Sequence, residues 1–497
     1  MLKIEKKNIV SDILGAMQQH PNRNAFVVEA VLYTYAQLGE KVGGIMNFLS
    51  TLQDERVGVI AENCIETYAA ILATLMSGKT YVILHPSYPE ERNLKIAGMA
   101  GLQTVLFAGS FDTEAFRQRG IVTVDAATLP EQAICASQCQ TDATANAYIM
   151  FTSGSTGEPK GVPISRSNLN AFYRAYNELG WKLNEHDRML QMFELTFDLS
   201  VVSLLHPLTL GACVYPVGYR DVKHIKVFEL LEDYQITFAA VTPSLLQLLS
   251  PYFADIHLPE LRYLILAAEA SQVALLDQFR ASVPNAEFIN LYGPTEATIY
   301  CSCYRIPATG CKHHNGMVAI GQPFDGIEVL IADEQGKSLP KGQMGELWVS
   351  GEQIMNGYLD APEKSSAALV QLANGKTYYR TGDLCIIDDN DDIIYCGRQD
   401  YQVKIQGFRI ELSEIEYTAK QFFDNLCNVV VIPTMHQGMF NELHMVVETL
   451  DCAEGELHGY LKEKLPHYMI PNKIHCIPQF PVTTSNKIDR KKIAQLI

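Results

Sequence analysis

Two spacings of apolar residues alternate along the first 150 positions of the chain. In residues 9–19 and 64–76 the apolar side chains recur at helical intervals, which predicts a helix in each segment. Short continuous apolar runs, which predict buried strands, occupy residues 57–60, 80–84, 104–107 and 122–124. Strands and helices that alternate in this way predict parallel sheets covered by helices.

The same two spacings continue through the next part of the chain. Helical spacing returns in residues 168–180, 226–234 and 243–250, and strand-like runs occupy residues 237–241 and 263–267. These segments extend the layered α/β pattern.

The pattern changes at about residue 317. From there to residue 399, short strand-like runs are separated by Gly, Asp and Asn turns, which predicts a small β-rich subdomain. The runs are residues 328–331, 346–349 and 392–396. We therefore expect an α/β fold with a large N-terminal domain, residues 1–399, of layered sheets and helices that includes the β-rich part.

A separate module is expected to follow from residue 400 to residue 497. Strand-like runs at 402–405, 428–432 and 443–449 alternate with helical spacing at 412–423 and 456–464. This mixture predicts a small mobile α+β C-terminal domain, with a hinge near Asp400.

The composition narrows the class of protein. The chain has 497 residues, of which 47% are apolar, enough for two or more domains with large cores. The formal net charge of −17 argues against a general nucleic-acid or anionic-membrane binder but not against a nucleotide site, which needs only local positive groups. Residues 1–7 are charged, and the chain has no apolar run of 18 residues. We therefore expect a soluble, cytoplasmic protein.

The 12 cysteines are scattered along the chain. Cys135 and Cys139 are four positions apart and Cys301 and Cys303 two apart, but neither pair has a second Cys or His pair at the spacing of zinc ligands. The composition therefore predicts reduced thiols.

Residues 148–163 carry the densest group of glycines and hydroxyls. The run reads Tyr-Ile-Met-Phe-Thr-Ser-Gly-Ser-Thr-Gly-Glu-Pro-Lys-Gly-Val-Pro. Glycine allows close backbone approach, and closely spaced N–H and O–H groups can surround a phosphate chain. The run differs from Gly-x-x-x-x-Gly-Lys-Ser/Thr, because Pro159 holds the second glycine position and Gly161 follows Lys160. It predicts a different kind of phosphate loop, whereas a solvated surface turn is the alternative.

This run and four later segments resemble the signatures of the adenylate-forming superfamily, which contains amino-acid adenylation domains, acyl-CoA synthetases and luciferases. The later segments are Asn290–Glu296, Tyr379–Leu384, Gly397–Glu411 and Asn486–Lys491. Five segments in the same order along nearly the whole chain make the resemblance specific. Within the superfamily, the chain resembles D-alanine–carrier protein ligases and prolyl-AMP ligases.

The resemblance implies an ATP site with Mg²⁺. It assigns the phosphates to Thr152, whose role is also catalytic, Tyr292 to the adenine, Asp383 and Arg398 to the ribose, and Glu296 to catalysis and to the metal. The remaining residues that it assigns to nucleotide binding are Ser153, Gly154, Ser155, Thr156, Gly157, Lys160, Ala268, Gly293 and Thr295.

The resemblance also implies a catalytic lysine and a hinge. Lys487 corresponds to the lysine that bridges the carboxylate and the α-phosphate in the family, although Asn486 replaces the glycine that usually precedes it. Asn tolerates the left-handed backbone, so we expect activity to be retained. Asp400 corresponds to the hinge, and Lys404 to a residue of the second conformation.

Asp198 corresponds to the aspartate that binds the α-ammonium of an amino acid in the family. A buried carboxylate without a cation is costly, so this residue predicts an amino-acid substrate, although an Asp that caps the following helix is the alternative. The substrate pocket implied by the resemblance comprises Asp198, Leu199, Val202, Ala240, Ile265, Ala267, Leu291, Ile299, Tyr300 and Lys487. Its apolar lining predicts a small or medium neutral amino acid such as alanine, proline or a valine-sized residue.

The expected function is therefore ATP-dependent formation of an aminoacyl-AMP with release of pyrophosphate, followed by transfer to the phosphopantetheine thiol of a separate carrier protein. We expect no nucleic-acid or membrane partner. Two alternatives stay open: an acyl- or aryl-CoA synthetase, which generally lacks the aspartate at position 198, and a non-catalytic nucleotide-binding protein on the same fold.

Overall fold

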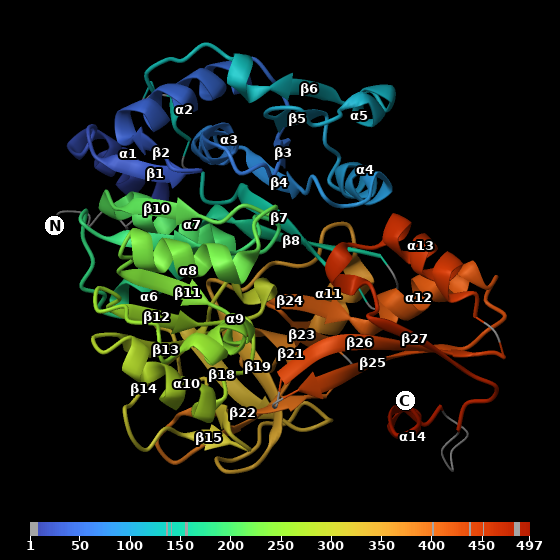
Figure 1. Ribbon diagram of the computed structural model, residues 1–497. Coiled ribbons are helices and arrows are strands. Elements are labelled where there is room, and N and C mark those ends of the chain that lie inside the picture. The colour runs from blue at the N-terminus through green and yellow to red at the C-terminus, as the bar shows by residue number, and fades with distance from the viewer. Residues whose placement is uncertain are drawn as a thin grey trace. The chain divides into compact units, whose positions relative to one another are not determined.

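The computed structural model describes residues 8–135, 138–140, 142–154, 158–399, 402–436, 439–450, 452–481 and 488–497 (Figure 1). The chain forms two compact units. The larger unit comprises residues 1–86, 97–150 and 161–399, and the smaller unit comprises residues 87–96, 151–160 and 400–497.

A nine-stranded sheet forms the main layer of the larger unit, in the order β17-β14-β13-β12-β11-β9-β10-β1-β2. The six strands from β13 to β1 are parallel, and β14, β17 and β2 are antiparallel to their neighbours. The strands are β1 (Asn24–Val28), β2 (Val31–Thr34), β9 (Arg188–Gln191), β10 (Cys213–Pro216), β11 (Phe238–Val241), β12 (Tyr263–Leu266), β13 (Glu287–Tyr292), β14 (Ser302–Ile306) and β17 (Gln322–Pro323).

A second sheet has the order β6-β5-β3-β4-β7-β8. The pairs from β6 to β7 are parallel, as the continuous apolar runs predict. The strands are β3 (Arg56–Ile60), β4 (Thr80–Leu84), β5 (Thr104–Phe107), β6 (Val122–Asp125), β7 (Asn146–Thr152) and β8 (Lys160–Ser165).

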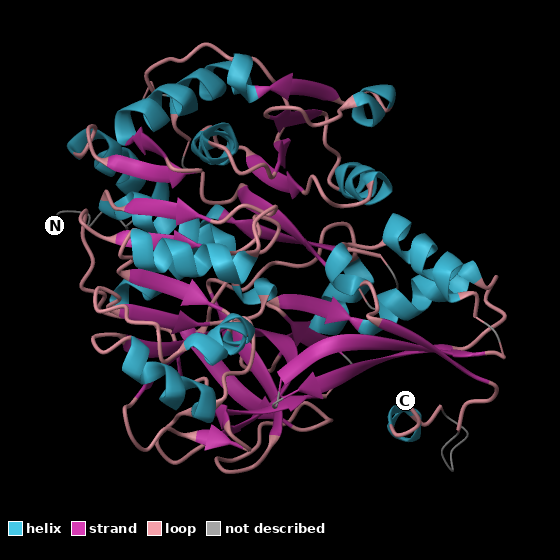
Figure 2. Cartoon of the chain, viewed as in Figure 1, coloured by secondary structure: helices cyan, strands magenta, loops and turns pink. Residues whose placement is uncertain are grey.

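Helices are interleaved with these two sheets (Figure 2). They are α1 (Ile9–Gln19), α2 (Tyr35–Leu49), α3 (Ile65–Met76), α4 (Glu90–Met99), α5 (Glu114–Gln118), α6 (Arg166–Glu178), α7 (Leu199–Leu210), α8 (Lys223–Asp233), α9 (Pro243–Leu249) and α10 (Val273–Phe279). Helix α3 is buried at every position except Glu66, because it is apolar on all sides. Helix α6 begins with a capping box between Ser165 and Asn168, which satisfies backbone N–H groups at its first turn.

The β-rich part of the larger unit is a five-stranded antiparallel sheet, β18-β19-β21-β20 with β22 paired to β21. Its strands are β18 (Ile327–Ala332), β19 (Gly345–Gly351), β20 (Leu369–Gln371), β21 (Thr377–Ile387) and β22 (Ile393–Arg398), with helix α11 (Pro362–Ala368) before β20. A small pair, β15 (His313–His314) and β16 (Met317–Val318), lies outside this sheet.

Among its described residues, the smaller unit contains a β-hairpin, a three-stranded sheet, three helices after residue 400 and most of helix α4. The hairpin is β23 (Gln402–Ile405) with β24 (Phe408–Glu411), and the sheet is β25 (Val429–His436), β26 (Met439–Glu448) and β27 (Lys473–Ile477). Its helices are α12 (Leu412–Phe422), α13 (Glu454–Lys464) and α14 (Arg490–Ala494). The predicted α/β class, with a sheet-rich larger part and a smaller α+β part, is confirmed.

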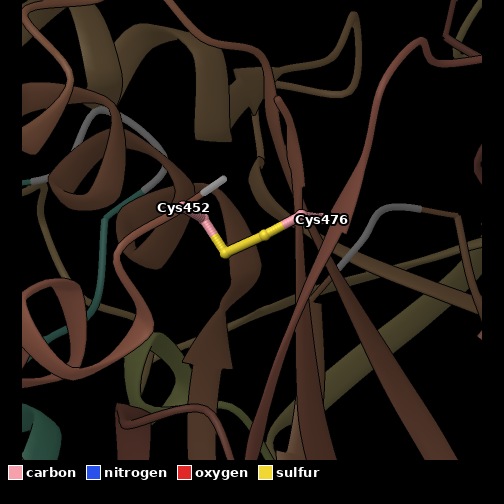
Figure 3. Close-up of a disulfide and its surroundings, with 2 residues drawn as sticks. All are labelled: Cys452 and Cys476. Atoms are coloured by element: carbon pink, nitrogen blue, oxygen red, sulfur yellow. A yellow bond between two sulfur atoms is a disulfide. The ribbon is translucent and has the colours of Figure 1, made fainter. Parts of the chain in front are cut away.

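One cysteine prediction is wrong. Cys452 and Cys476 form a disulfide with a Cα–Cα distance of 6.1 Å (Figure 3), so not all thiols are reduced. The two residues are 24 positions apart, and helix α13 lies between them in the sequence. The spacing of the two cysteines matches no recognisable motif, so the pairing becomes evident only from the fold, which brings them within disulfide distance. The other ten cysteines form no disulfide.

Among the described residues, no helix is both long enough and apolar enough to cross a bilayer.

Candidate active site

Asp383 lies at the centre of a polar cluster formed by three strands of the larger unit. It is directly opposite Arg398 in the antiparallel pair of β21 and β22, and Arg398 Nη1 lies 2.7 Å from Asp383 Oδ1. The hydroxyl of Tyr292, at the end of β13, donates a hydrogen bond to Asp383 Oδ2. Burial, and then the charge of Asp383, raises the pKa of Tyr292 well above its usual value, so the tyrosine remains a donor. The fold thus brings together three residues that the sequence assigns to the nucleotide.

The segment after Tyr292 turns sharply and carries Glu296. Gly293 is required here, because a Cβ would lie 2.5 Å from the carbonyl oxygen of Ile299. Glu296 lies in a 3₁₀ turn, Thr295–Ala297, and is fully buried. The hydroxyl of Tyr358 donates to Glu296 Oε1 over 2.9 Å. This bond holds the carboxylate of the predicted metal ligand in place within the larger unit.

Thr298 and Ile299, which follow Glu296, have positive φ angles of 56° and 72°. Such angles are rare for residues with a branched Cβ. The side chain of Gln353 donates to the carbonyl oxygens of Ala297 and Tyr300 over 2.8 and 2.6 Å. The sequence did not point to Gln353, because its partners are more than 50 positions away.

Asp198 lies immediately before helix α7 and is 4% exposed. Its side chain makes no capping hydrogen bond to the helix, so the helix-cap alternative is wrong. Three tyrosines, Tyr81, Tyr148 and Tyr300, are buried near enough for the charge of Asp198 to act on them: burial first, and this charge second, raises the pKa of each. Tyr81 and Tyr148 are also neighbours in register on β4 and β7. Neither was predicted, because single residues inside apolar runs give no functional signal.

The other predicted pocket residues come from strand ends and from two turns. Ala240 on β11 is in register with Ile265 on β12, and Leu291 lies near the end of the next strand, β13. Carboxyl ends of adjacent parallel strands form a common edge, where ligands bind in open α/β sheets. All of the pocket residues that the structure describes are buried except Leu199, which is half-buried.

Ala268 follows the end of β12 and was assigned to the nucleotide. Its φ angle is 72°, which is unusual for a residue other than Gly, Asn or Asp. The next residue, Glu269, accepts a hydrogen bond of 2.9 Å from the backbone N–H of Ser244 at the start of α9. The strained backbone is thus followed by a residue anchored to a neighbouring helix.

The predicted phosphate loop is described on both sides of Ser155–Gly157, three residues that lie outside the described range. Within the smaller unit, Thr152 Oγ1 is buried and has no hydrogen-bond partner among the described residues. A Cβ at Gly154 would lie 2.0 Å from the carbonyl oxygen of Glu158, so only glycine fits. A buried hydroxyl without a partner and a glycine in a tight turn are features that a phosphate group would use.

The loop also contacts other parts of the smaller unit. Ser153 Oγ donates to the carbonyl oxygen of Arg409 over 2.9 Å, and the Gly154 N–H donates to Glu414 Oε2 over 3.1 Å. Lys160 Nζ lies 3.9 Å from Glu411 Oε1. The sequence did not predict Glu414, whose carboxylate binds a backbone N–H of the phosphate loop.

Three further predictions fall at or near undescribed positions. Lys487 and Asp400 lie outside the described residues, so their predicted roles in catalysis and in the hinge stay predictions. Lys404 lies on β23 and is half-buried.

The comparisons with known proteins agree on one family. A family model described as AMP-binding enzyme matches residues 15–359. The chain is 31% identical to bacitracin synthase 3 of Bacillus licheniformis over 95% of its own length, but it spans only 7% of that protein. It is 30% identical to zwittermicin A synthase ZmaJ of Bacillus cereus, covering 96% of this chain and 92% of that one.

Solved structures give the same result. The adenylation domain AlmE of Vibrio cholerae, in complex with glycyl-adenosine-5'-phosphate, has a TM-score of 0.88 and 27% identity, with 100% of this chain and 98% of that chain covered. A four-domain nonribosomal peptide synthetase bound to AMP and glycine has a TM-score of 0.72 and 28% identity, with 98% of this chain and 36% of that chain covered. The similarity therefore extends along the whole chain.

Proposed function

Because the chain belongs to the AMP-binding enzyme family, we propose that it is an ATP-dependent ligase that activates a small neutral amino acid as the aminoacyl-AMP and releases pyrophosphate. The observation that carries the proposal is the burial of Asp198. This carboxylate is 4% exposed and does not cap helix α7. A buried carboxylate is stabilised by a cation, and the α-ammonium of an amino acid supplies one.

The size of the substrate follows from the side chains around Asp198. Tyr300 and Leu291 would narrow the pocket, and the proposed lining carries no second charge apart from Lys487. We propose alanine or proline, or a residue of similar size, as the substrate. The similarity to AlmE, whose structure contains glycyl-adenosine-5'-phosphate, supports a small amino acid.

We propose that the nucleotide binds to the residues predicted from the sequence. Tyr292 would contact the adenine, and Asp383 and Arg398 would bind the ribose; in the protein alone Tyr292 and Arg398 both donate to Asp383. When the nucleotide binds, each side chain would replace part of these contacts within the protein by contacts to the nucleotide. Thr152 and Gly154 have the features that suit a phosphate group, with Lys160 as the nearby cation.

Mg²⁺ fits the donor set at Glu296, since Mg²⁺ prefers carboxylate and phosphate oxygens. One carboxylate alone is not a complete cage, which is typical of magnesium that also binds the phosphates of a substrate. When bound, the ion would neutralise charge on those phosphates.

The proposed chemistry divides between the two half-reactions. Adenylation gives the carboxylate an AMP leaving group, and the residues above hold the amino acid in line with the α-phosphorus. Lys487 would stabilise the charge that develops there. We further propose that residues 400–497 turn about Asp400, with Lys404 serving the second conformation. The phosphopantetheine thiol of a separate carrier protein would then attack the acyl carbon, form the thioester and release AMP as the acyl–phosphate bond breaks.

The test is pyrophosphate release from ATP and Mg²⁺ with each common L-amino acid and with D-alanine. The proposal expects one strong responder among the small neutral amino acids. Coenzyme A with fatty or aromatic acids serves as the control. Thioester formation with these acids, together with no response to amino acids, would overturn the proposal in favour of an acyl- or aryl-CoA synthetase. Nucleotide binding without turnover would point to a non-catalytic protein.

A further inference from the structure

The turn that carries two of the proposed pocket residues is held in an unusual conformation. Thr298 has φ and ψ angles of 56° and 78°, and Ile299 has a φ angle of 72°. Residues with branched Cβ atoms rarely adopt this backbone conformation, and two successive ones keep it only where the surrounding structure imposes it. The residues that hold this turn therefore also determine where Ile299 and Tyr300 lie in the pocket wall.

Gln353 provides most of these constraints. Its side-chain amide has two hydrogens, and both are used: Nε2 donates to the carbonyl oxygens of Ala297 and Tyr300, on either side of the left-handed pair. The hydroxyl of Thr298 donates in turn to the carbonyl oxygen of Gln353. Gln353 is 2% exposed, so water does not compete for these bonds. Gln353 therefore forms three hydrogen bonds to the turn, two from its side-chain amide and one through its backbone carbonyl.

The position of Gln353 is itself fixed. Asn168 on α6 donates from Nδ2 to the carbonyl oxygens of Glu352 and Ile354, over 2.7 and 3.0 Å. These are the two chain neighbours of Gln353. The constraint therefore extends from a helix of the larger unit, through residues 352–354, to the turn.

The turn determines where the Tyr300 side chain lies. Its ring centroid is 6.3 Å from that of Phe172 and 6.5 Å from that of Tyr176. Its hydroxyl is buried without a partner among the described residues. Because Tyr300 has Asp198 as an electrostatic neighbour, any rotation of the turn would change the space available beside that carboxylate.

We propose that Gln353 is a positioning residue for amino-acid selection, acting by holding the Thr298–Ile299 turn so that Ile299 and Tyr300 limit the size of the substrate beside Asp198. This inference rests on the proposed function. Because Gln353 bonds to the turn, we expect it to act through the position of the turn, and its removal should change the choice of amino acid more than the use of ATP.

The test compares wild type with Gln353→Met, which keeps the length of the side chain but removes both donors. Pyrophosphate release is measured with the preferred amino acid and with an analogue one or two methylenes larger. We expect the ratio of the two kcat/KM values to fall about tenfold or more, since one methylene in a pocket changes selectivity by roughly 10- to 200-fold. The amino-acid KM should rise, whereas the KM for ATP should change less than about twofold. A general loss of folded enzyme would lower the activity with both substrates and would not separate the two KM values.

Two further variants complete the design. Glu352→Gln removes only the charge of Glu352, which forms an exposed ion pair of 2.8 Å with Arg174, and should leave the selectivity ratio unchanged. Thr298→Gly keeps the Gln353 amide but removes the hydroxyl that donates to the Gln353 carbonyl oxygen and gives the turn access to other backbone angles; it should relax selectivity even if Gln353→Met does not fold.

The outcomes separate this inference from the function on which it rests. Active wild type together with an unchanged ratio in both Gln353→Met and Thr298→Gly would overturn the inference alone. The same conclusion follows if Gln353→Met lowers kcat with both amino acids equally and leaves their ratio intact. Wild type that responds to no amino acid would overturn the proposed function and this inference with it.

Discussion

Arg92 and Glu414 form a buried ion pair of 2.8 Å, although 322 positions separate them in the sequence. Their side chains are 6% and 1% exposed. The second carboxylate oxygen of Glu414 accepts the hydrogen bond from the Gly154 N–H. One side chain of α12 therefore connects the start of α4 with the predicted phosphate loop inside the smaller unit.

Removal of one partner of this pair should destabilise the smaller unit strongly. Arg92→Met leaves the Glu414 carboxylate buried without its cation, and we expect a loss of about 3–5 kcal/mol in the free energy of unfolding. Denaturant unfolding of the single variants and of Arg92→Met/Glu414→Gln measures the coupling. The double variant should recover part of the loss; a double variant as unstable as the sum of the singles would show that the pair is not coupled.

Asp383 should matter more for ATP than for the amino acid. Asp383→Asn keeps the shape of the side chain but removes the charge that both Arg398 and Tyr292 face. Because hydrogen bonds to charged groups contribute about 1.5–3 kcal/mol, we expect the KM for ATP to rise by about one to two orders of magnitude. Steady-state kinetics with each substrate varied in turn measures this, and an increase confined to the amino-acid KM would contradict the assignment.

The Cys452–Cys476 disulfide should stabilise the smaller unit. A cross-link that spans 24 positions removes denatured-state entropy equivalent to about 3.5 kcal/mol in the chain-entropy model. Thiol titration of the unfolded, unreduced chain should count ten thiols, and the count should rise to all 12 cysteines of the chain after reduction. Cys452→Ser/Cys476→Ser should unfold at a lower denaturant concentration, and a full count before reduction would contradict the disulfide.

The stability of the three-stranded sheet should depend on pH through His475. Burial, then the neighbouring His444 and Lys473, lowers the pKa of His475 below its ordinary value of 6.5, although Glu454 acts in the opposite direction. The folded state therefore binds this proton less tightly than the unfolded chain. Stability is full above pH 6.5 and falls as the pH drops through the lowered pKa.

Hydrogen exchange measures this effect directly in β26 and β27. Protection of their amides, corrected for the intrinsic pH dependence, should decrease from pH 7.5 to pH 5.5 in wild type. The decrease should be smaller in His475→Gln, which carries no titrating ring. An equal decrease in both proteins would assign the pH dependence to other groups.

Local pattern predicted the elements well where packing follows from spacing. The helix expected at residues 9–19 is α1, Ile9–Gln19, whose first turn is capped by the Asn8 side chain. The strand expected at residues 80–84 is β4, which is buried at every position. In both segments the apolar pattern alone predicts which residues are buried.

The site could be predicted only in part, because its contacts join distant segments. Asp383 and Arg398 were recognisable from their motifs, and the register of β21 and β22 makes them partners. Gln353, by contrast, lies in a segment without a motif, and its importance follows from bonds to a turn more than 50 positions away. The disulfide and the Arg92–Glu414 pair could not be predicted from the sequence either, because their partners lie in separate segments and carry no motif.

The central claim is that Asp198 selects an amino acid through its α-ammonium. The most direct measurement compares pyrophosphate release with the preferred amino acid and with the same acid lacking the amino group, for example alanine and propionate, in wild type and in Asp198→Ala. The account predicts that wild type uses the amino acid and not the deaminated acid, and that Asp198→Ala loses this preference by about two orders of magnitude or more, since a site built to pair a polar group strongly rejects a substrate without it. Equal use of both acids by wild type, or an unchanged preference in Asp198→Ala, would contradict it.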